Sequence, residues 1–275
     1  MSKHATVTAL MPAYQASEFV QPVLASLSAQ TYADFTVIVS VDQCADHTYD
    51  ICTRHAESDP RFRVIRQVQR LGYVGNCNFL LNQADADYVL FAFHDDILLP
   101  DCVQRLADVL DARPEVVMSY CDMLVTAVDG TEEHWAFTAL EGLTDPLQRG
   151  MTMLQRTNGW WVPNRGMFRL AEARKIQGLK THGAGEFSAD LPWLFHMSLL
   201  GAFARVPETL CHKFYKPGSL SKSWEFSKTE LFELGVACLR EIWISPLASE
   251  QKLALAVPLM NGLIKSRQQP QPARR

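Results

Sequence analysis

The sequence lacks the features that mark membrane-spanning and exported proteins. Its longest apolar runs, residues 88–93 and 253–260, are far shorter than the ~20 residues that a membrane-spanning helix needs. The first 14 residues contain Pro12 and no uninterrupted apolar stretch of the kind found in signal peptides. We therefore expect a cytoplasmic chain whose contact with a membrane, if any, is peripheral and at the inner face.

Paired cysteines and excess positive charge are also lacking. The seven cysteines include no CxxC pair, which argues against a zinc knuckle or a disulfide framework and suits a reducing compartment. The formal net charge is -4, so the chain has no overall positive field to hold a phosphate backbone. Nucleic acid is not an expected partner.

Three common catalytic and nucleotide-binding motifs are missing as well. The chain contains no GxGxxG, no GxxxxGK and no GxSxG. These absences argue against a dinucleotide-dependent dehydrogenase, a P-loop ATPase and an α/β-hydrolase, respectively.

What the chain does contain is an alternation of strand-like and helix-like segments. With 48% hydrophobic and 20% charged residues, it can bury a substantial core. The alternation predicts a doubly wound α/β sheet that starts with parallel strands. The predicted strands are residues 6–11, 35–41, 62–67 and 88–93. Between them we expect a first helix with Ser17 as its N-cap, and then helices at residues 48–56 and 76–84. From residue 116 the pattern changes to strands at 116–121 and 124–128, followed by a hairpin turn at Asp129-Gly130.

Carboxylates follow two of the predicted strands. Asp42, close to Asp46 and Thr48, comes directly after residues 35–41, and Asp95-Asp96 comes after residues 88–93. Ligands of open α/β sheets bind beyond the carboxyl ends of the strands, although single carboxylates there often only cap helices. Two adjacent carboxylates repel unless a cation screens them, so the pair predicts an Mg²⁺ or Mn²⁺ ion with a bound diphosphate.

Two segments carry a resemblance to a known family. MPAYQASEFVQPVLASLSAQTYADFTVIVSVDQCADHT and RLGYVGNCNFLLNQADADYVLFAFHDDILLP resemble the nucleotide-sugar-binding half of family 2 glycosyltransferases of the GT-A fold. The similarity is dense over residues 5–125 and looser to residue 222. It implies a GT-A type doubly wound mixed sheet with flanking helices, divided into a nucleotide-sugar-binding half (1–125) and an acceptor-side half (126–222). Residues 223–266 are expected to form a C-terminal helical extension, and residues 267–275 a disordered tail.

The resemblance also implies roles for individual residues in donor binding. Asp96 is implied as the most direct metal ligand, with Asp95 beside it in the place of the DXD motif. The residues implied to bind the nucleotide sugar are Pro12, Ala13, Tyr14, Glu18, Asp42, Gly72, Asn78, Asp95, Lys216 and Ser219. Of these, Asp42 is implied to accept a hydrogen bond from the base, and Lys216 and Ser219 to lie on a loop over the diphosphate.

The catalytic base implied by the resemblance is Asp190, in the segment GEFSAD. From the residues alone, Asp190 and Glu186 could instead favour a helix N-terminus. The sequence departs from the family pattern at Gln43, where a second carboxylate is common, and at Phe93, where many members have the first Asp of DXD.

The function implied is inverting transfer of a sugar from a nucleotide-diphosphate sugar, with a UDP-sugar favoured, to a glycan or lipid-linked acceptor. Bacterial polysaccharide or glycan assembly is the setting that the resemblance favours. Two alternatives stay open: a non-catalytic nucleotide-sugar-binding regulatory protein, motivated by Gln43 and Phe93, and a sugar nucleotidyltransferase.

Overall fold

A single mixed sheet forms the centre of the protein, shown here as a computed structural model that describes residues 5–216, 218–222 and 224–268. The strands lie in the order β3, β2, β1, β4, β8, β6, β9 and β5, and β7 pairs with β6. The strands are β1 (Val7–Ala13), β2 (Phe35–Val41), β3 (Phe62–Arg66), β4 (Tyr88–Phe91), β5 (Asp96–Leu98), β6 (Val116–Thr126), β7 (Glu132–Trp135), β8 (Met167–Arg169) and β9 (Ala202–Phe214).

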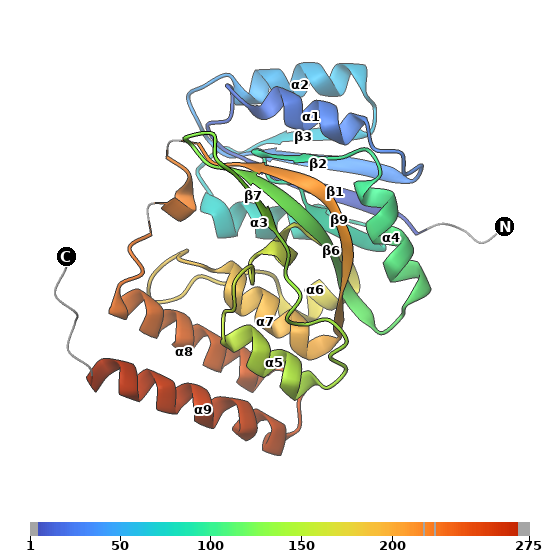
Figure 1. Cartoon of the computed structure of the whole chain (residues 1–275). Helices are drawn as coiled ribbons and strands as arrows, with labels where there is room; N and C mark the ends of the chain where they lie inside the picture. Colours follow the sequence, from blue (N-terminus) through green and yellow to red (C-terminus); the bar gives the residue numbers. More distant parts are fainter. Residues whose placement is uncertain (1–4, 217, 223, 269–275) are drawn as a thin grey trace.

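Helices cover both faces of this sheet. They are α1 (Val20–Ser28), α2 (Thr48–Ser58), α3 (Gly72–Gln83), α4 (Cys102–Ala112), α5 (Pro146–Leu154), α6 (Leu170–Ile176), α7 (Asp190–Leu200), α8 (Lys228–Ile244) and α9 (Ser249–Gln268), with short 3₁₀ helices η1 (Val162–Arg165) and η2 (Leu220–Lys222). Figure 1 shows α1 and α2 side by side on one side of β1 to β3 and α3 on the other. Because both faces are covered, every residue of β1 is buried.

The predicted change from parallel to mixed pairing is confirmed. β1 pairs in parallel with β2 and β4, and β2 in parallel with β3. β8 is antiparallel to both β4 and β6, and β5 is antiparallel to β9. The hairpin turn predicted at Asp129-Gly130 joins β6 to β7, and Gly130 there has a φ of 85°.

Three local predictions were wrong. The strands expected at 116–121 and 124–128 are one strand, β6, because its register against β9 shifts at Cys121 and Asp122 without ending the pairing. Helix α3 starts at Gly72 rather than residue 76. Phe19, not Ser17, precedes α1, and the Ser17 backbone N–H donates to Asp46 Oδ2 at 3.0 Å.

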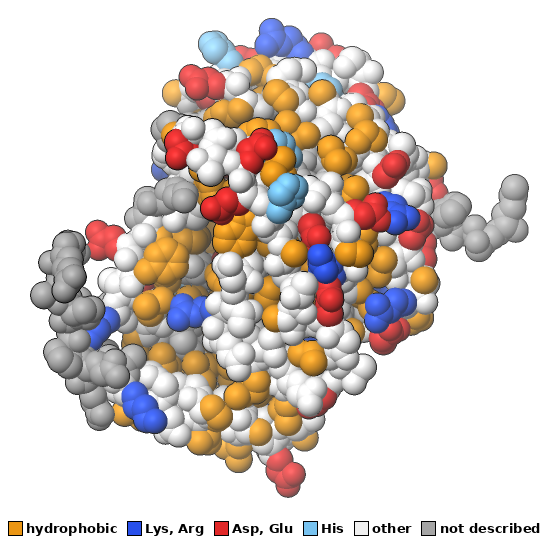
Figure 2. Space-filling view, in the orientation of Figure 1, with side chains coloured by type: hydrophobic (Ala, Val, Ile, Leu, Met, Phe, Trp, Pro, Cys, Tyr) orange, Lys and Arg blue, Asp and Glu red, His pale blue; other side chains and the backbone are white. Residues whose placement is uncertain are grey.

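The last two helices, α8 and α9, pack against each other and against α7 and α5. Figure 1 shows them along the edge of the molecule farthest from α1 and α2. The helix α9 reaches Gln268, so residues 267 and 268 are helical, and the rest of the predicted tail lies outside the described residues. Within the part of the chain that the structure describes, no helix has both the length and the apolar content needed to cross a membrane. On the face seen in Figure 2, Lys and Arg side chains lie among Asp and Glu side chains.

Candidate active site

The predicted site residues of the first half gather where β1, β2 and β4 end. These strands are adjacent and parallel, so their carboxyl ends meet at one edge of the sheet. Asp42 follows β2 directly, and His94 and Asp95 lie between β4 and β5. His94 Nδ1 is 2.9 Å from the Pro12 carbonyl oxygen, which ties the loop after β4 to the end of β1.

Asp42 holds the loop in front of α3. Its carboxylate is 3% exposed, and it accepts hydrogen bonds from the backbone N–H of Leu71 at 2.7 Å and of Gly72 at 2.9 Å. A carboxylate at a helix N-terminus is favoured by the free N–H groups there. Its predicted hydrogen bond to a base would add to these two, since a carboxylate has further lone pairs.

Glu186 from the second half covers the same helix start. Its Oε1 accepts the Val74 backbone N–H at 2.8 Å. Gly72 has a φ of 75°, and a Cβ there would lie 2.7 Å from Glu186 Oε1. Both the backbone conformation and the close carboxylate therefore require glycine at position 72.

Asn78 links the two halves at the middle of α3. Its Nδ2 donates to the Leu179 carbonyl and its Oδ1 accepts the Leu179 N–H, both at 2.8 Å. These bonds use both polar groups of the side chain within the protein. The predicted contact between Asn78 and the nucleotide stays a prediction.

The remaining first-half residues lie around the end of β1. Pro12 and Ala13 are buried within the sheet, whereas Glu18 is exposed. Tyr14 is half-buried, and the Arg70 guanidinium lies 4.3 Å from the centre of its ring. Of these four predicted residues, Tyr14 and Glu18 are the ones whose side chains can reach a ligand.

Three cations surround the Asp95-Asp96 pair. Asp96 is 2% exposed; its Oδ2 accepts the Arg165 Nε–H at 3.0 Å, and its Oδ1 lies 3.4 Å from Lys213 Nζ. Lys213 is brought there by register, because it is the residue opposite Asp96 in the β5–β9 pair. Asp95 Oδ2 lies 3.6 Å from Lys216 Nζ and 3.9 Å from Lys213 Nζ.

The charges of this cluster shift the pKa values of their neighbours. Burial raises the pKa of Asp95, but Lys213, His94 and Lys216 outweigh burial and bring that pKa to about 2. Burial lowers the pKa of Arg165, but Asp96 and Asp95 outweigh it and raise that pKa above its ordinary value. Arg165 is also held between aromatic rings, at 4.7 Å from the centre of Phe93 and 5.6 Å from that of Trp161.

The donor set does not fit the predicted Mg²⁺ or Mn²⁺ ion. Such ions usually take one or two carboxylates together with waters and phosphates, and here both carboxylate oxygens of Asp96 and Oδ2 of Asp95 already face ammonium or guanidinium groups. Phe93 supplies an aromatic face where a third carboxylate would help. Among the described residues, no three His, Cys, Asp or Glu side chains are grouped so as to hold a metal.

Lys216 and Ser219 share one tight turn after β9. The Lys216 backbone N–H donates to Ser219 Oγ at 3.1 Å, and the Ser219 N–H donates to the Lys216 carbonyl at 3.1 Å. Ser219 therefore shapes the turn that carries Lys216. The Lys216 ammonium lies 3.2 Å from the centre of the Phe19 ring.

Asp190 begins α7 and is 8% exposed. Its Oδ2 is 3.4 Å from Asn164 Nδ2, and its Oδ1 has no hydrogen-bond partner among the described residues. Burial raises the pKa of Asp190, and Arg165 opposes that rise only in part. Asn164, which reaches Asp190, is followed in the chain by Arg165, which donates to Asp96, so η1 contacts both carboxylates.

Sequence reasoning missed Arg165, Asn164 and Tyr73. Asn164 Nδ2 lies 3.5 Å from the Tyr73 hydroxyl and also reaches Asp190. The signal that could have found two of them was the segment NRGMFR, whose first two residues are Asn164 and Arg165. Asn164 and Arg165 end the 3₁₀ helix η1, which is too short to show a periodicity that would mark it as functional, and Met167–Arg169 form β8.

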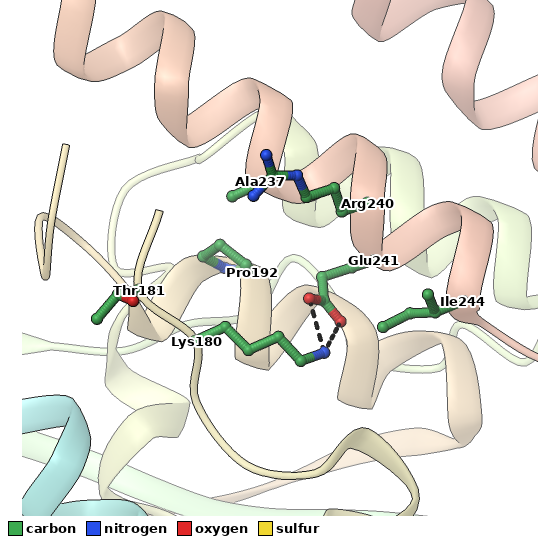
Figure 3. Close-up of a pocket in the computed structure, with 7 residues that line it drawn as sticks. All are labelled: Lys180, Thr181, Pro192, Ala237, Arg240, Glu241 and Ile244. Carbon is green, nitrogen blue, oxygen red and sulfur yellow. Dashed lines mark hydrogen bonds and ion pairs between the residues drawn. The ribbon is translucent and has the colours of Figure 1, made fainter. Parts of the chain in front are cut away.

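A separate hollow lies between α7 and α8. Lys180, Pro192, Glu241 and Ile244 are among its lining residues, and none of the predicted site residues is. Figure 3 shows Lys180 reaching across it to Glu241. This contact joins the C-terminal helices to the rest of the protein.

The sheet order and the position of the site define a GT-A type fold, which comparison with solved structures confirms. S. aureus TarS in complex with UDP-GlcNAc aligns with a TM-score of 0.71 at 17% identity, covering 93% of this chain and 72% of that one. Mannosyltransferase PcManGT from Pyrobaculum calidifontis, in complex with GDP-Man and Mn²⁺, aligns with a TM-score of 0.61 at 15% identity, covering 97% and 74%.

The sequence matches the profile of glycosyl transferase family 2 over residues 8–165, and the chain belongs to that family. The putative glycosyltransferase EpsH of Bacillus subtilis (strain 168) is 30% identical over 150 residues, or 50% of this chain and 43% of EpsH. The putative teichuronic acid biosynthesis glycosyltransferase TuaG of the same organism is 25% identical over 138 residues, or 50% of this chain and 54% of TuaG. The matches thus span about half the length of these relatives.

Proposed function

We propose that this protein transfers a sugar from a nucleotide-diphosphate sugar, with a UDP-sugar favoured, to an acceptor hydroxyl with inversion at the anomeric carbon. The observation that carries the proposal is Asp190, a buried carboxylate with a raised pKa that lies against Asn164, the residue next to Arg165 in the chain. Perturbed carboxylates next to a charged cluster are typical of a general base. Family membership and the UDP-GlcNAc complex of TarS support the substrate class.

The proposed step is one displacement. Asp190 accepts the proton of the acceptor hydroxyl as its oxygen forms a bond to the anomeric carbon. The bond from that carbon to the donor diphosphate breaks, and its electron pair leaves with the diphosphate oxygen. Attack from the face opposite the leaving group inverts the configuration.

A glycan or lipid-linked acceptor in bacterial polysaccharide or glycan assembly fits the name of TuaG. A lipid-linked acceptor would bring the protein to a membrane surface. Exposed apolar side chains on the last two helices support peripheral contact there, and they include Trp243, Ile244, Leu253, Val257 and Met260.

The test is a panel of UDP-, GDP- and dTDP-sugars incubated with the protein, once in EDTA and once in Mn²⁺. We expect release of the nucleoside diphosphate from at least one donor, and product of opposite anomeric configuration by NMR once an acceptor is found. Retained configuration would contradict the single displacement. Protein that binds a nucleotide sugar and never turns it over would favour the regulatory alternative, which Phe93 and Gln43 motivate.

A further inference from the structure

The cations around the Asp95-Asp96 pair outnumber the carboxylates that they face. Arg165, Lys213 and Lys216 lie within 4 Å of the two carboxylates, which leaves one positive charge in excess. Arg165 and Lys213 both donate to Asp96, whereas the Lys216 ammonium makes no hydrogen bond to the described residues. The excess charge therefore belongs chiefly to Lys216.

Lys216 differs from the other two cations in side-chain exposure and in hydrogen bonding. The Arg165 and Lys213 side chains are 14% and 7% exposed, whereas that of Lys216 is 24% exposed. Its Nζ atom is itself buried, makes no hydrogen bond to the described residues and lies against the face of Phe19, so the exposed part of the side chain is its aliphatic stem. An ammonium held this way keeps donors free for an anion.

A divalent cation would meet opposition at the same place. To bind Asp96, it would have to displace Lys213 or Arg165, whose side chains are 7% and 14% exposed and would lose their partner. At Asp95 it would meet the ammonium groups of Lys216 and Lys213, at 3.6 and 3.9 Å from Oδ2. Leaving a buried charge unpaired is costly. Phe93, under the Arg165 guanidinium, offers the ion no ligand in exchange.

We propose that the Lys216 ammonium, backed by Lys213 and Arg165, takes the place of a divalent cation at the donor diphosphate, so that this protein binds its donor without metal. The proposal rests on the proposed function, since it concerns the same donor site. The two aspartates then orient the cations rather than a metal. During transfer, Lys216 would stabilise the charge that develops on the leaving diphosphate.

The first experiment is calorimetric titration of the full chain with UDP, GDP, ADP, CDP and dTDP, in EDTA and in Mn²⁺. We expect at least one of them to bind with affinities that agree within about twofold in the two conditions. Binding that needs Mn²⁺ would overturn the metal-free site and leave the proposed function standing. Absence of binding in both conditions would overturn both proposals.

A pair of matched variants isolates Lys216. Lys216→Met should weaken nucleotide binding in EDTA by about 10- to 100-fold, the range expected for loss of a charge-assisted hydrogen bond. Lys175→Met removes the same charge from an exposed ion pair with Glu172 and should leave affinity unchanged. Equal affinities for the two variants would overturn the proposal, and thermal unfolding of both checks that they are folded.

Asp95→Asn distinguishes the two roles of the aspartate by the sign of the effect. If Asp95 orients Lys216, removing its charge frees the ammonium for the diphosphate, and affinity in EDTA should stay equal or rise. If Asp95 is a metal ligand, affinity in Mn²⁺ should fall towards the value in EDTA, because the variant loses the metal-dependent part of binding. A fall in the affinity of this variant in Mn²⁺ would overturn the proposal.

Discussion

Two features of the surroundings of Asp190 have opposite effects on the pKa of its carboxyl group. It is buried at the start of α7, where the helix N-terminus favours a negative charge, yet its Oδ1 lacks a partner among the described residues. The net result is a raised pKa. A carboxyl group of this kind binds a proton more readily than an exposed one, as a general base must, and it makes the folded state less stable when ionised.

The first prediction at the residue scale concerns catalysis by Asp190. Asp190→Asn should lower kcat by ~10²–10⁴-fold, the usual contribution of a general base, while donor affinity stays nearly unchanged. In the wild type, kcat/KM should fall with decreasing pH through a pKa above that of an ordinary carboxyl, because the base must be unprotonated. Steady-state kinetics from pH 4 to 9 check both points. An undiminished rate in the variant would transfer the role to another residue, Glu186 being the nearest candidate.

The same substitution predicts a gain in stability. The folded-state pKa of Asp190 is raised, so its contribution to stability is most favourable below the pKa of the unfolded chain and is lost as pH rises through the folded pKa. Asp190→Asn should therefore raise the Tm at pH 8, and the gain should vanish near pH 3. Thermal unfolding at the two pH values measures this. A variant that melts lower than wild type at pH 8 would show that the ionised carboxylate is stabilising.

Gly72 gives a third prediction at this scale. Gly72→Ala forces alanine to a φ of 75° and brings its Cβ within 2.7 Å of Glu186 Oε1. Gly130→Ala is a matched control, since Gly130 has a φ of 85° and nothing lies within 4 Å of an added Cβ. The control should lose roughly 1–2 kcal/mol from backbone strain alone, and Gly72→Ala should lose more. Equal losses by urea unfolding would mean that Glu186 moves aside freely.

At the scale of elements, the sequence predicts features that depend on a local pattern. It does not predict contacts between segments that are far apart in the chain. The bounds of β2 were predicted correctly because its β-branched run and the polar turn after it are local signals. The position of Asp42 and Asp95 at one edge followed from parallel order alone. In contrast, Arg165 lies 69 positions from Asp96 in the chain and Lys213 lies 117, and no periodicity joins them.

Those distant pairs changed the interpretation of the site. From the sequence, Asp95-Asp96 predicts a metal because two adjacent carboxylates repel. In the structure, Arg165 of η1 and Lys213 of β9 lie against these carboxylates. A motif of like charges indicates that a cation is needed, and only the tertiary fold shows which cation is there.

Asn78 gives the prediction at the scale of elements. Asn78→Ala removes two hydrogen bonds between α3 and Leu179 and should cost about 1–3 kcal/mol of unfolding free energy. Asn82→Ala, on an exposed position of the same helix, should cost little. If Asn78→Ala instead lowers nucleotide affinity and leaves stability unchanged, the side chain contacts the nucleotide, as the family resemblance implies.

At the scale of the whole molecule, the C-terminal helices complete the core of the half formed by residues 126–222. α7 is buried along nearly its whole length, and α8 covers one side of it. Glu241 of α8 connects the two helices: it is 3% exposed, and its Oε2 lies 2.6 Å from Nδ1 of His196 in α7. Lys180 donates to both carboxylate oxygens of Glu241 at 2.9 Å. Residues 223–266 were predicted as an extension, and these contacts predict that they unfold together with residues 1–222.

Substitution of Glu241 tests this cooperative behaviour. Glu241→Ala removes the shared partner of His196 and Lys180, and loss of one member of a buried pair typically costs about 3–5 kcal/mol. Arg240→Ala, an exposed neighbour that also lines the hollow in Figure 3, is the matched control and should cost little. Urea unfolding followed by both circular dichroism and tryptophan fluorescence should show one shared transition, shifted to lower urea in Glu241→Ala. Two separated transitions would mean that α8 and α9 form an independent unit, and equal midpoints for the two variants would mean that the buried carboxylate does not fasten α8 to α7.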